Sequence, residues 1–317
     1  MRGLRSTPRI GIAELQGDAR RRRRESRIRR AFLAAAATAI IINVAILLSL
    51  FDGVVDFFRE LSAGPGLGSL WNDTGWFPRR NLFDVRTVFV GTVMISLIAM
   101  LVAAPLGLGA AMYLSEYASR RARRILKPIL EILAGIPSVV MAYFVISFIS
   151  PDIVQRLFAG ATFYNMLGAG IGVGILISPI VASVAEDAMH AVPATLREAS
   201  FGLGARRKST TLRTVFPAAI SGIVAALILG VSRAIGETLV VTLAAGATGG
   251  SAFTVDPLGP GQTMTAALAS LATGSDQVKG GSAAFPSLFF LGALLFLFTL
   301  ALNLISDRFV RRVRRRY

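Results

Sequence analysis

The stretch from Glu186 to Pro217 reads EDAMHAVPATLREASFGLGARRKSTTLRTVFP and separates two long apolar segments. Proline lacks a backbone donor but is tolerated in the first turn of a helix, so Pro193 marks a helix start. Gly202 or Gly204 marks its end, because glycine accepts the left-handed backbone of a C-terminal cap. The pattern therefore predicts a short helix that protrudes from a bundle of apolar segments.

Apolar segments of membrane-spanning length recur along the chain, which has 317 residues, 54% of them hydrophobic and 16% charged. A helix rises about 1.5 Å per residue, so roughly 20 apolar residues cross the hydrocarbon core of a bilayer. Six segments have about this length: 31–51, 87–114, 129–149, 166–185, 215–245 and 284–306. The sequence predicts an all-α membrane protein with six transmembrane helices and no soluble domain.

The formal charge of +16 is explained by where the basic residues lie. If the N-terminus is cytoplasmic, 27 of the 34 Lys and Arg residues fall in four cytoplasmic segments, 1–30, 115–128, 186–214 and 307–317. This distribution follows the positive-inside rule and predicts that both termini are cytoplasmic. Because orientation accounts for the charge, nucleic acid is not an expected partner.

Charge and hydropathy together divide the chain into five parts. They are a basic cytoplasmic tail (1–30), a first transmembrane helix (31–51), an external segment (52–86), a five-helix core (87–306) that contains the cytoplasmic loop 186–214, and a second basic cytoplasmic tail (307–317). The first span lacks a small-residue cleavage signature and is interpreted as a retained helix. The arginine run of the first tail makes membrane lipid an expected contact. Trp71 and Trp76 predict anchoring of the external segment at the headgroup level, or docking of an external protein.

A charged pair lies inside the fifth predicted span. Arg233 and Glu237 are four residues apart and therefore neighbours on one helical face. Each would cost about 2.5 to 3.5 kcal/mol at the bilayer centre, so both are expected to face the bundle or an aqueous path. Arginine donates two parallel hydrogen bonds to an oxyanion and stays charged at physiological pH. Two hypotheses follow: a substrate contact, or a buried ion pair that fixes the helix register.

The stretch around the short helix resembles the EAA loop of ABC importer permeases. The residues that carry the resemblance are Glu198, Ala199, Ser200, Gly204, Phe216 and Pro217. The spacing is intact, although Ser200, Thr214 and Phe216 replace the usual Ala, Ile and Leu. The resemblance implies a type I ABC importer (MetI-like) permease core. It also implies that the short helix is a coupling helix, whose Glu198, Ala199, Ser200 and Gly204 serve contact with an ATPase subunit.

A second resemblance concerns the charged pair. The segment Arg233-Ala-Ile-Gly-Glu-Thr238 resembles the Arg-Ala-(Ile or Leu)-Gly-Glu-Thr segment of phosphate-specific (Pst) ABC permeases, and Tyr113-Leu-Ser-Glu-Tyr117 looks like a further part of that family. The resemblance covers nearly all of the chain from about residue 31. It implies that Arg233, Glu237 and Thr238 line a translocation path for inorganic phosphate. The long first external segment looks more like the C-type permease of this family than the A-type.

The resemblance implies a multi-pass subunit of the bacterial cytoplasmic (inner) membrane. Its expected partners are an A-type homologous permease, two ATP-binding subunits and an external phosphate-binding protein. No segment resembles Gly-x-x-x-x-Gly-Lys-Ser/Thr, so ATP is expected to be used by the partner ATPase and no cofactor to be bound by this chain. The glycine run 168–174 lies in a span and predicts close helix packing rather than nucleotide binding. Without cysteine, and with one histidine, no metal site is expected.

Two alternative functions stay open. A type I permease for another oxyanion, such as molybdate or sulfate, would share the EAA loop, and only the segment around Arg233 favours phosphate. A membrane scaffold or sensor without a transport path is the alternative from another class, and a neighbouring gene for a P-loop ATPase would count against it. An enzyme is not expected, because the spans lack paired carboxylates or a nucleophile with its base.

We expect protease added to the outside of spheroplasts to cleave within 52–86 and to spare 186–214. The reason is the positive-inside distribution, which places the first loop outside and the second in the cytoplasm. Immunodetection of a C-terminal tag on the fragments measures the outcome. Cleavage of 52–86 only after the membrane is opened would contradict the topology.

Overall fold

The computed structural model describes residues 19–72, 74–246, 249–273 and 283–314. Parts of both predicted basic tails, namely 1–18 and 315–317, lie outside the described residues, as does 274–282 of the loop before the last span. The chain divides into two compact units, Met1–Asp52 and Gly53–Tyr317.

The described residues of the first unit form part of a single helix, which is basic at its start and apolar beyond Arg30. Helix α2 runs Ala19–Ala63 and crosses the boundary between the units. Its large apolar side chains, such as Phe32 and Ile41, are exposed, and none of its most hydrophobic stretch is buried within the protein. A long helix that is apolar all round suits a lipid surrounding. The helix begins before the predicted span 31–51 and continues past it into the segment predicted to be external.

The second unit contains the end of α2 and the elements that follow it. In chain order these are η1 (Leu67–Trp71), β1 (Trp76–Phe77), η2 (Pro78–Arg80), β2 (Leu82–Phe83), α3 (Val85–Met112), η3 (Tyr113–Tyr117), α4 (Arg120–Leu133), α5 (Ser138–Phe144), η4 (Val145–Val154), α6 (Gln155–Leu157), α7 (Met166–His190), α8 (Ala194–Gly202), α9 (Arg207–Thr210), η5 (Thr211–Val215), α10 (Phe216–Ala218), α11 (Ile220–Ile235), α12 (Leu239–Ala244), α13 (Met264–Ala272) and α14 (Pro286–Arg314). The elements η1 and η2 are 3₁₀ turns, whereas η3, η4 and η5 are π-helical.

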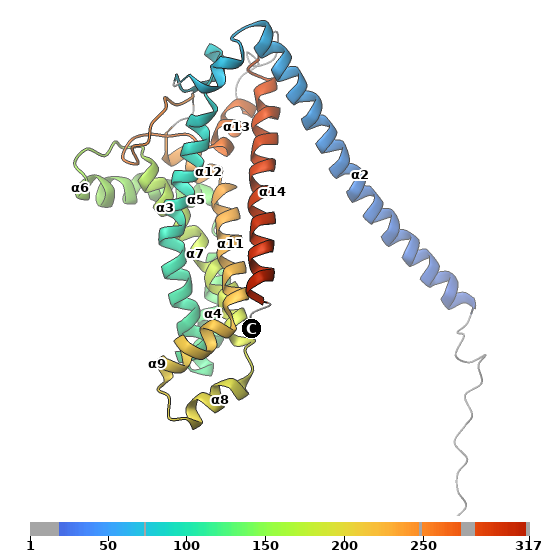
Figure 1. Cartoon of the computed structure of the whole chain (residues 1–317), viewed down its shortest axis with the longest axis vertical. Helices are drawn as coiled ribbons and strands as arrows, with labels where there is room; N and C mark the ends of the chain where they lie inside the picture. The colour runs from blue at the N-terminus through green and yellow to red at the C-terminus, as the bar shows by residue number, and fades with distance from the viewer. Residues whose placement is uncertain (1–18, 73, 247–248, 274–282, 315–317) are drawn as a thin grey trace, which may run out of the picture. The chain divides into compact units, whose positions relative to one another are not determined.

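Helices α3 and α7 pack along their length at the centre of this unit, with α11 and α14 beside them (Figure 1). Glycines on α7 make the close approach possible. A Cβ added at Gly174 would lie 2.7 Å from the carbonyl oxygen of Ala99, and one at Gly170 would lie 2.6 Å from Ile98. Since real side chains do not approach this closely, only glycine fits here. The packing role predicted for the glycine run 168–174 is confirmed.

Among the described residues, five helices are long and apolar enough to cross a membrane, or six if one bent pair forms a single span. This confirms the expected all-α membrane fold. The bent pair, Arg207–Ala218 and Ile220–Ile235, turns by 74°. It corresponds to the predicted span 215–245, which is therefore not one continuous helix.

The third predicted span, 129–149, also differs from the structure. Its first residues belong to α4, which ends at Leu133, and the spanning helix begins at Ser138 and extends to Leu157. Gly135 and Pro137 explain the interruption, because glycine weakens a helix and proline disfavours the helical conformation of the residue before it.

A compact cap covers one end of the second unit. Strands β1 and β2 form an antiparallel hairpin with Trp76 opposite Phe83, and Asn81 turns between them with φ of 57°. Trp76 is completely buried, and its ring meets that of Phe83 edge to face at 5.7 Å. The expectation that Trp76 anchors the segment at the headgroups is therefore wrong for this residue, which belongs to the core of the cap. Trp71 is exposed.

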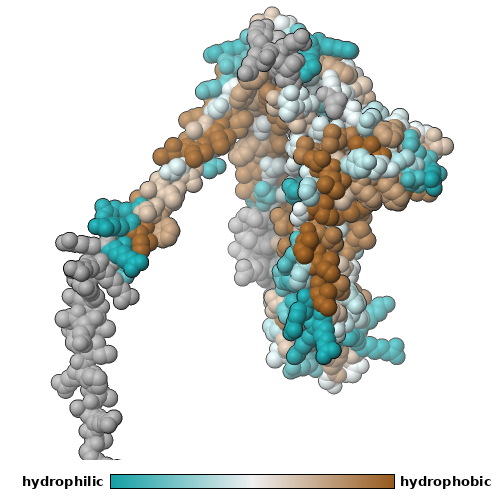
Figure 2. All heavy atoms as spheres, turned by 180° about the vertical axis from the view of Figure 1, so that it is seen from behind, coloured by the Kyte–Doolittle hydropathy of each residue, from teal (hydrophilic) through white to brown (hydrophobic). Residues whose placement is uncertain are grey.

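Apolar side chains gather on the outside of the helices between the two ends of the second unit. Figure 2 shows hydrophobic residues along the middle of the visible face and hydrophilic residues towards its lower end. Leu101 on α3, Tyr143 on α5 and Leu297 on α14 are among the exposed ones. An apolar surface of this kind suits lipid or another membrane subunit.

We expect Gly174→Ala to destabilise the protein by about 1 to 3 kcal/mol, because the new methyl group would overpack the contact between α3 and α7. Gly109→Ala on α3 is the matched control, since a Cβ there meets nothing within 4 Å. Alanine at that site should be neutral or stabilising by up to about 1 kcal/mol. Thermal unfolding of both purified variants in detergent measures the difference. Equal melting temperatures would contradict the packing argument.

Candidate functional site

The fifth span is interrupted where the sequence places its charged pair. Helix α11 ends at Ile235, and α12 begins at Leu239. The backbone between them is not helical, and one carboxylate oxygen of Glu237 accepts a hydrogen bond of 3.4 Å from the N–H of Val240. Glu237 therefore satisfies one of the backbone donors that a helix start leaves without a partner.

Arg233 and Glu237 have very different surroundings. The side chain of Glu237 is 4% exposed, whereas that of Arg233 is 50% exposed. Their closest atoms, Arg233 Nη2 and Glu237 Oε2, lie 3.8 Å apart. At this distance the pair attracts electrostatically but forms no good hydrogen bond. The guanidinium group thus keeps donors available on its open side.

Hydroxyl groups from other elements support the interruption. Thr265 Oγ1 donates a 2.9 Å hydrogen bond to the carbonyl oxygen of Glu237. Thr263 caps α13 by accepting from the N–H of Ala266. Thr92 on α3 accepts from the N–H of Met264 at 3.0 Å. The short helix α13 therefore packs its N-terminal end against the interruption.

The protruding helix predicted from the sequence is α8, at the opposite end of the unit from the hairpin (Figure 1). It follows Pro193 and ends in a Schellman motif, in which Gly204 donates to the carbonyl of Phe201 and Ala205 to that of Ser200. Gly204 has φ of +79°, a conformation that glycine adopts at little cost. Of the two glycines considered for the helix end, Gly204 is the cap.

The predicted coupling residues divide between two environments. Glu198 and Ala199 are exposed, whereas Ser200 is partly buried. The hydroxyl of Ser200 lies 2.9 Å from that of Thr210 on α9, so the helix is joined to the chain that follows it. The first residues of the predicted loop 186–214 extend α7, which ends at His190.

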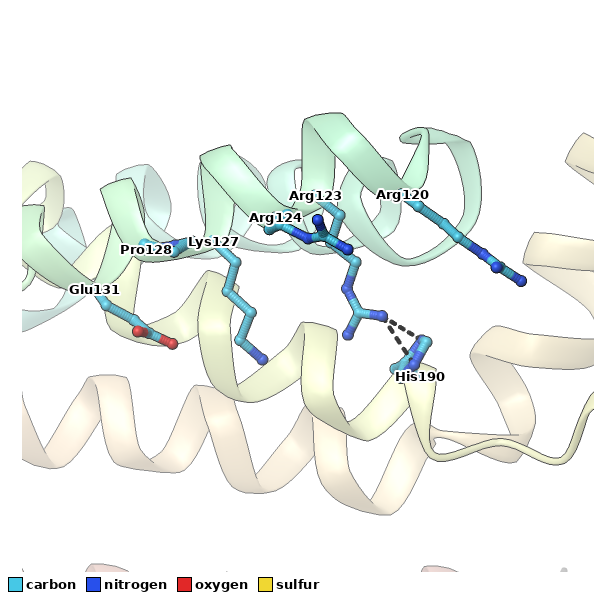
Figure 3. A pocket seen from close by; sticks show the side chains of 7 residues that line it. All are labelled: Arg120, Arg123, Arg124, Lys127, Pro128, Glu131 and His190. Carbon is cyan, nitrogen blue, oxygen red and sulfur yellow. Dashed lines mark hydrogen bonds between the residues drawn. The ribbon is translucent and has the colours of Figure 1, made fainter.

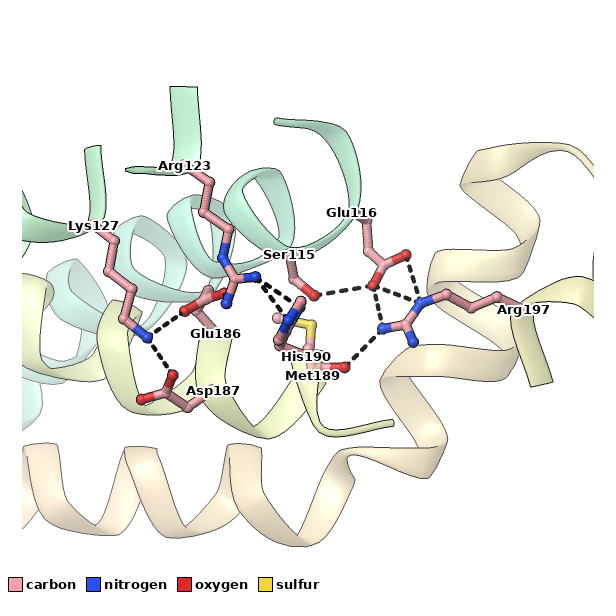
Figure 4. Close-up of polar contacts among 9 residues, drawn as sticks. All are labelled: Ser115, Glu116, Arg123, Lys127, Glu186, Asp187, Met189, His190 and Arg197. Carbon is pink, nitrogen blue, oxygen red and sulfur yellow. Dashed lines mark hydrogen bonds and ion pairs between the residues drawn. The ribbon is translucent and has the colours of Figure 1, made fainter. Parts of the chain in front are cut away.

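Arg197, next to Glu198 in the sequence, binds a buried carboxylate (Figure 4). Its Nη2 lies 2.8 Å from Oε1 of Glu116, which is on η3 at the end of α3. The same guanidinium donates to the backbone carbonyls of Met189 and Val192 at 2.8 and 2.6 Å. Glu116 is 7% exposed.

A second buried carboxylate, Glu186 on α7, binds two cations from α4 (Figure 4). Its oxygens lie 2.5 Å from Nη2 of Arg123 and 2.9 Å from Nζ of Lys127. Lys127 also pairs with the more exposed Asp187. Burial lowers the pKa of Lys127, but the hydrogen bonds to Asp187 and Glu186 and the charges of both outweigh it, so the pKa is raised. Lys127 therefore stays charged in its contact with α7.

A groove of about 640 Å³ lies between α4 and the end of α7 (Figure 3). Its lining consists of Arg120, Arg123, Arg124, Lys127, Pro128, Glu131 and His190. Nη1 of Arg123 lies 2.9 Å from Nδ1 and 2.8 Å from Nε2 of His190. Within the described part of the chain, no three His, Cys, Asp or Glu side chains cluster as metal ligands.

Sequence reasoning missed several residues that the structure brings together. Glu116 lies in the segment Tyr113–Tyr117, and Arg197 is adjacent to Glu198. The sequence did not indicate that these two residues pair, because 81 positions separate them. Glu186 offered a clearer signal, because an acidic residue at the end of an apolar helix needs a cation. Thr263 and Thr265 offered no signal beyond the ability of threonine to cap a helix.

A bundle of apolar spans, with one span interrupted at an ionisable pair and a short helix protruding from one end, defines a membrane transport subunit. Residues 103–317 match the family described as "Binding-protein-dependent transport system inner membrane component", and the chain belongs to this family. It is therefore a multi-pass permease component of a bacterial ABC importer. ATP is used by separate ATPase subunits, and the permease has no catalytic site of its own.

Individual proteins resemble most of the chain. It is 30% identical over 308 residues to the "Probable ABC transporter permease protein YqgH" of Bacillus subtilis, covering 94% of this chain and 97% of that one. It is 31% identical over 298 residues to the "Phosphate transport system permease protein PstC" of Mesorhizobium japonicum, with 88% of each chain covered.

A solved structure shares the fold. A chain of a bacterial alginate ABC transporter, solved with an alginate pentasaccharide-bound periplasmic protein, superposes with a TM-score of 0.59. The identity is 16%, and the match covers 91% of this chain and 97% of that one. At this identity the likeness concerns the fold, and it confirms the permease fold of ABC importers expected from the sequence.

We expect Glu186→Ala to destabilise the protein by about 3 kcal/mol, because it leaves Arg123 and Lys127 without the buried carboxylate. Asp187→Ala is the matched control on the same turn. Its side chain is 61% exposed, so its loss should cost less than about 1 kcal/mol. Thermal unfolding in detergent at pH 7 distinguishes the two, and equal losses would refute the assigned role of Glu186.

Proposed function

We propose that this permease imports inorganic phosphate and that Arg233 contacts the anion, with Glu237 and Thr238 beside it in the path. The observation that carries the proposal is the half-exposed guanidinium at the interruption of the fifth span, 3.8 Å from a buried carboxylate. A guanidinium with free donors suits a tetrahedral oxyanion. Glu237 would hold the arginine when the path is empty and weaken capture of other anions.

Phosphate is favoured over other oxyanions by the chain's relatives. The PstC protein of Mesorhizobium japonicum is named for phosphate transport and is 31% identical to this chain. The segment from Arg233 to Thr238 also resembles that of the phosphate-specific family. Molybdate and sulfate are the competing substrates, since a guanidinium group alone would bind them as well.

The assembly that we propose contains this chain as the C-type permease, an A-type permease, two ATPase subunits and an external phosphate-binding protein. Both termini and α8 would face the cytoplasm, and the hairpin would face the binding protein. Exposed apolar residues such as Leu101 and Tyr143 would meet lipid or the second permease. Closure of the ATPase dimer would move α8 and open the path outward, as in alternating access.

Gly204→Pro and Glu198→Lys should each leave the protein in the membrane but uncouple ATP hydrolysis from uptake. Proline cannot adopt the φ of +79° at Gly204, and the change at Glu198 would reverse the charge of an exposed docking residue. Gly202→Ala is the control, because a Cβ there meets nothing within 4 Å. Phosphate uptake and ATPase co-purification are measured together. Normal uptake with normal ATPase association in both variants would refute the coupling role.

Arg233→Gln should lower phosphate uptake roughly ten- to a hundredfold, since a hydrogen bond to a charged group contributes about 1.5 to 3 kcal/mol. Radiolabelled phosphate uptake, in cells that lack the native chain, measures this. Excess sulfate or molybdate should not compete in the wild type. If either anion competes as well as phosphate does, the substrate assignment is wrong.

The double variant Arg233→Gln with Glu237→Gln separates substrate contact from a structural ion pair. A buried pair can often be neutralised at little cost, so a purely structural pair would regain transport when both charges are removed. We expect assembly to recover and uptake to stay low. Near-normal uptake by the double variant would reject Arg233 as an anion contact.

A further inference from the structure

The end of helix α3 holds a buried carboxylate whose cationic partner comes from another helix. Glu116 lies in the π-helical turn η3, which continues α3 as far as Tyr117. Ser115 donates to its Oε1 at 3.0 Å, and Arg197 on α8 supplies the positive charge. A buried carboxylate requires such a partner, because desolvation of an unpaired charge costs several kcal/mol.

Arg197 makes more contacts than an ordinary ion pair needs. Besides the 2.8 Å contact from Nη2, its Nε lies 3.2 and 3.3 Å from the two oxygens of Glu116. Nη1 and Nη2 donate to the carbonyls of Val192 and Met189, which lie where α7 ends and the chain turns into α8. One guanidinium therefore joins the ends of α3 and α7 to α8. Its planar geometry fixes direction as well as distance.

Two other contacts restrict the same region. Arg207 on α9 lies over the ring of Tyr117, with Cζ 5.2 Å from the ring centroid. Ser200 on α8 meets Thr210 on α9 at 2.9 Å. The chain before and after the Schellman turn is thus attached to the same π-helical turn, so α8 is held at more than one point.

Other side chains of α8 are exposed. Leu196 and Phe201 are 43% and 47% exposed, and Glu198 is exposed beside them. Exposed apolar residues on a short protruding helix suit contact with another protein. Exposed side chains of α8 are therefore available to the ATPase subunit, while Arg197 attaches the same helix to the ends of α3 and α7.

We propose that Glu116 and Arg197 form a joint that transmits movement of α8 to α3 and α7. This inference rests on the coupling role proposed for α8. The joint is defined by these two residues, which act as positioning residues and contact neither substrate nor ATP. Movement of α8 acts directly on α3, which packs against α7 and contacts α11. Loss of the joint leaves the exposed residues of α8 able to bind the ATPase subunit. Movement of α8 is then no longer passed on to α3 and α7.

The test uses the complete transporter in proteoliposomes, with its binding protein, and measures phosphate imported per ATP hydrolysed. We expect Arg197→Gln to retain the ATPase subunits and ATP hydrolysis while this ratio falls at least about tenfold, the effect of a loss near 1.4 kcal/mol. Arg213→Gln is the matched control, since this arginine on η5 is exposed. It should leave the ratio unchanged.

Two results would overturn the proposal. An unchanged ratio in Arg197→Gln would show that α8 transmits without the joint. Loss of the ATPase subunits from this variant would show that Arg197 is needed for ATPase binding instead.

A cross-linking experiment keeps the proposal testable even if Arg197→Gln fails to fold. The chain contains no cysteine, so Glu116→Cys with Arg197→Cys creates the only thiols in this subunit. A short reversible thiol cross-linker should restore the ratio in the double variant, and a reductant should remove it again. The single variant Glu116→Cys, treated in the same way, is the control. If cross-linking leaves the ratio of the double variant low, or if that ratio is normal before cross-linking, the joint is refuted.

Failure of the proposed joint can be distinguished from failure of the phosphate assignment. If the wild-type transporter hydrolyses ATP in response to its binding protein but takes up no phosphate, the substrate assignment fails. The ratio is then measured with the anion that is imported. If the wild type imports phosphate and Arg197→Gln does so with equal efficiency, only the joint fails.

Discussion

A backbone in an apolar surrounding must satisfy its own N–H and C=O groups, and this constraint shapes the whole second unit. Continuous helices meet the constraint without help, as α3 and α7 do. The fifth span does not, because it is interrupted between Ile235 and Leu239. The carboxylate of Glu237 and the hydroxyl of Thr265 then supply partners that the helix no longer provides. The interruption is tolerated because neighbouring elements repair it, and it is the place where a guanidinium is half exposed.

Charges in the same unit follow a related rule. Glu116 and Glu186 are buried, and each meets a cation from another element. Both lie at the end that carries α8, where they join helices to one another. Arg233 differs from these closely paired groups, because 3.8 Å separates it from Glu237 and its side chain is half exposed. A buried carboxylate in close contact with a cation suits a structural role or the transmission of movement between helices. A guanidinium without such a close contact keeps hydrogen-bond donors for an anion.

The sequence predicted much of the fold and part of the candidate site. It identified the protruding helix and both candidate glycines for its end, but the Schellman motif selected Gly204. It placed Trp76 at a membrane interface, whereas the hairpin buries that residue completely. It treated Arg233 and Glu237 as neighbours on a regular helix, yet the helix ends before Glu237. In each case the sequence pattern singled out a residue that matters in the structure. Its backbone conformation or burial depended on contacts that the pattern does not contain.

Hydropathy and charge bias are sums over neighbouring residues, so the sequence by itself determined the membrane fold class, the approximate positions of most spans and the expected orientation. The left-handed turn that ends a helix depends on a glycine close in sequence. The end of the short helix was therefore predictable from the sequence. Pairing depends on residues far apart in the chain. Glu116 meets Arg197 across 81 positions, and Thr92 meets the N–H of Met264 across 172. Only the tertiary structure decides such contacts, because a buried polar group takes whichever partner the packing of the helices brings within hydrogen-bond distance.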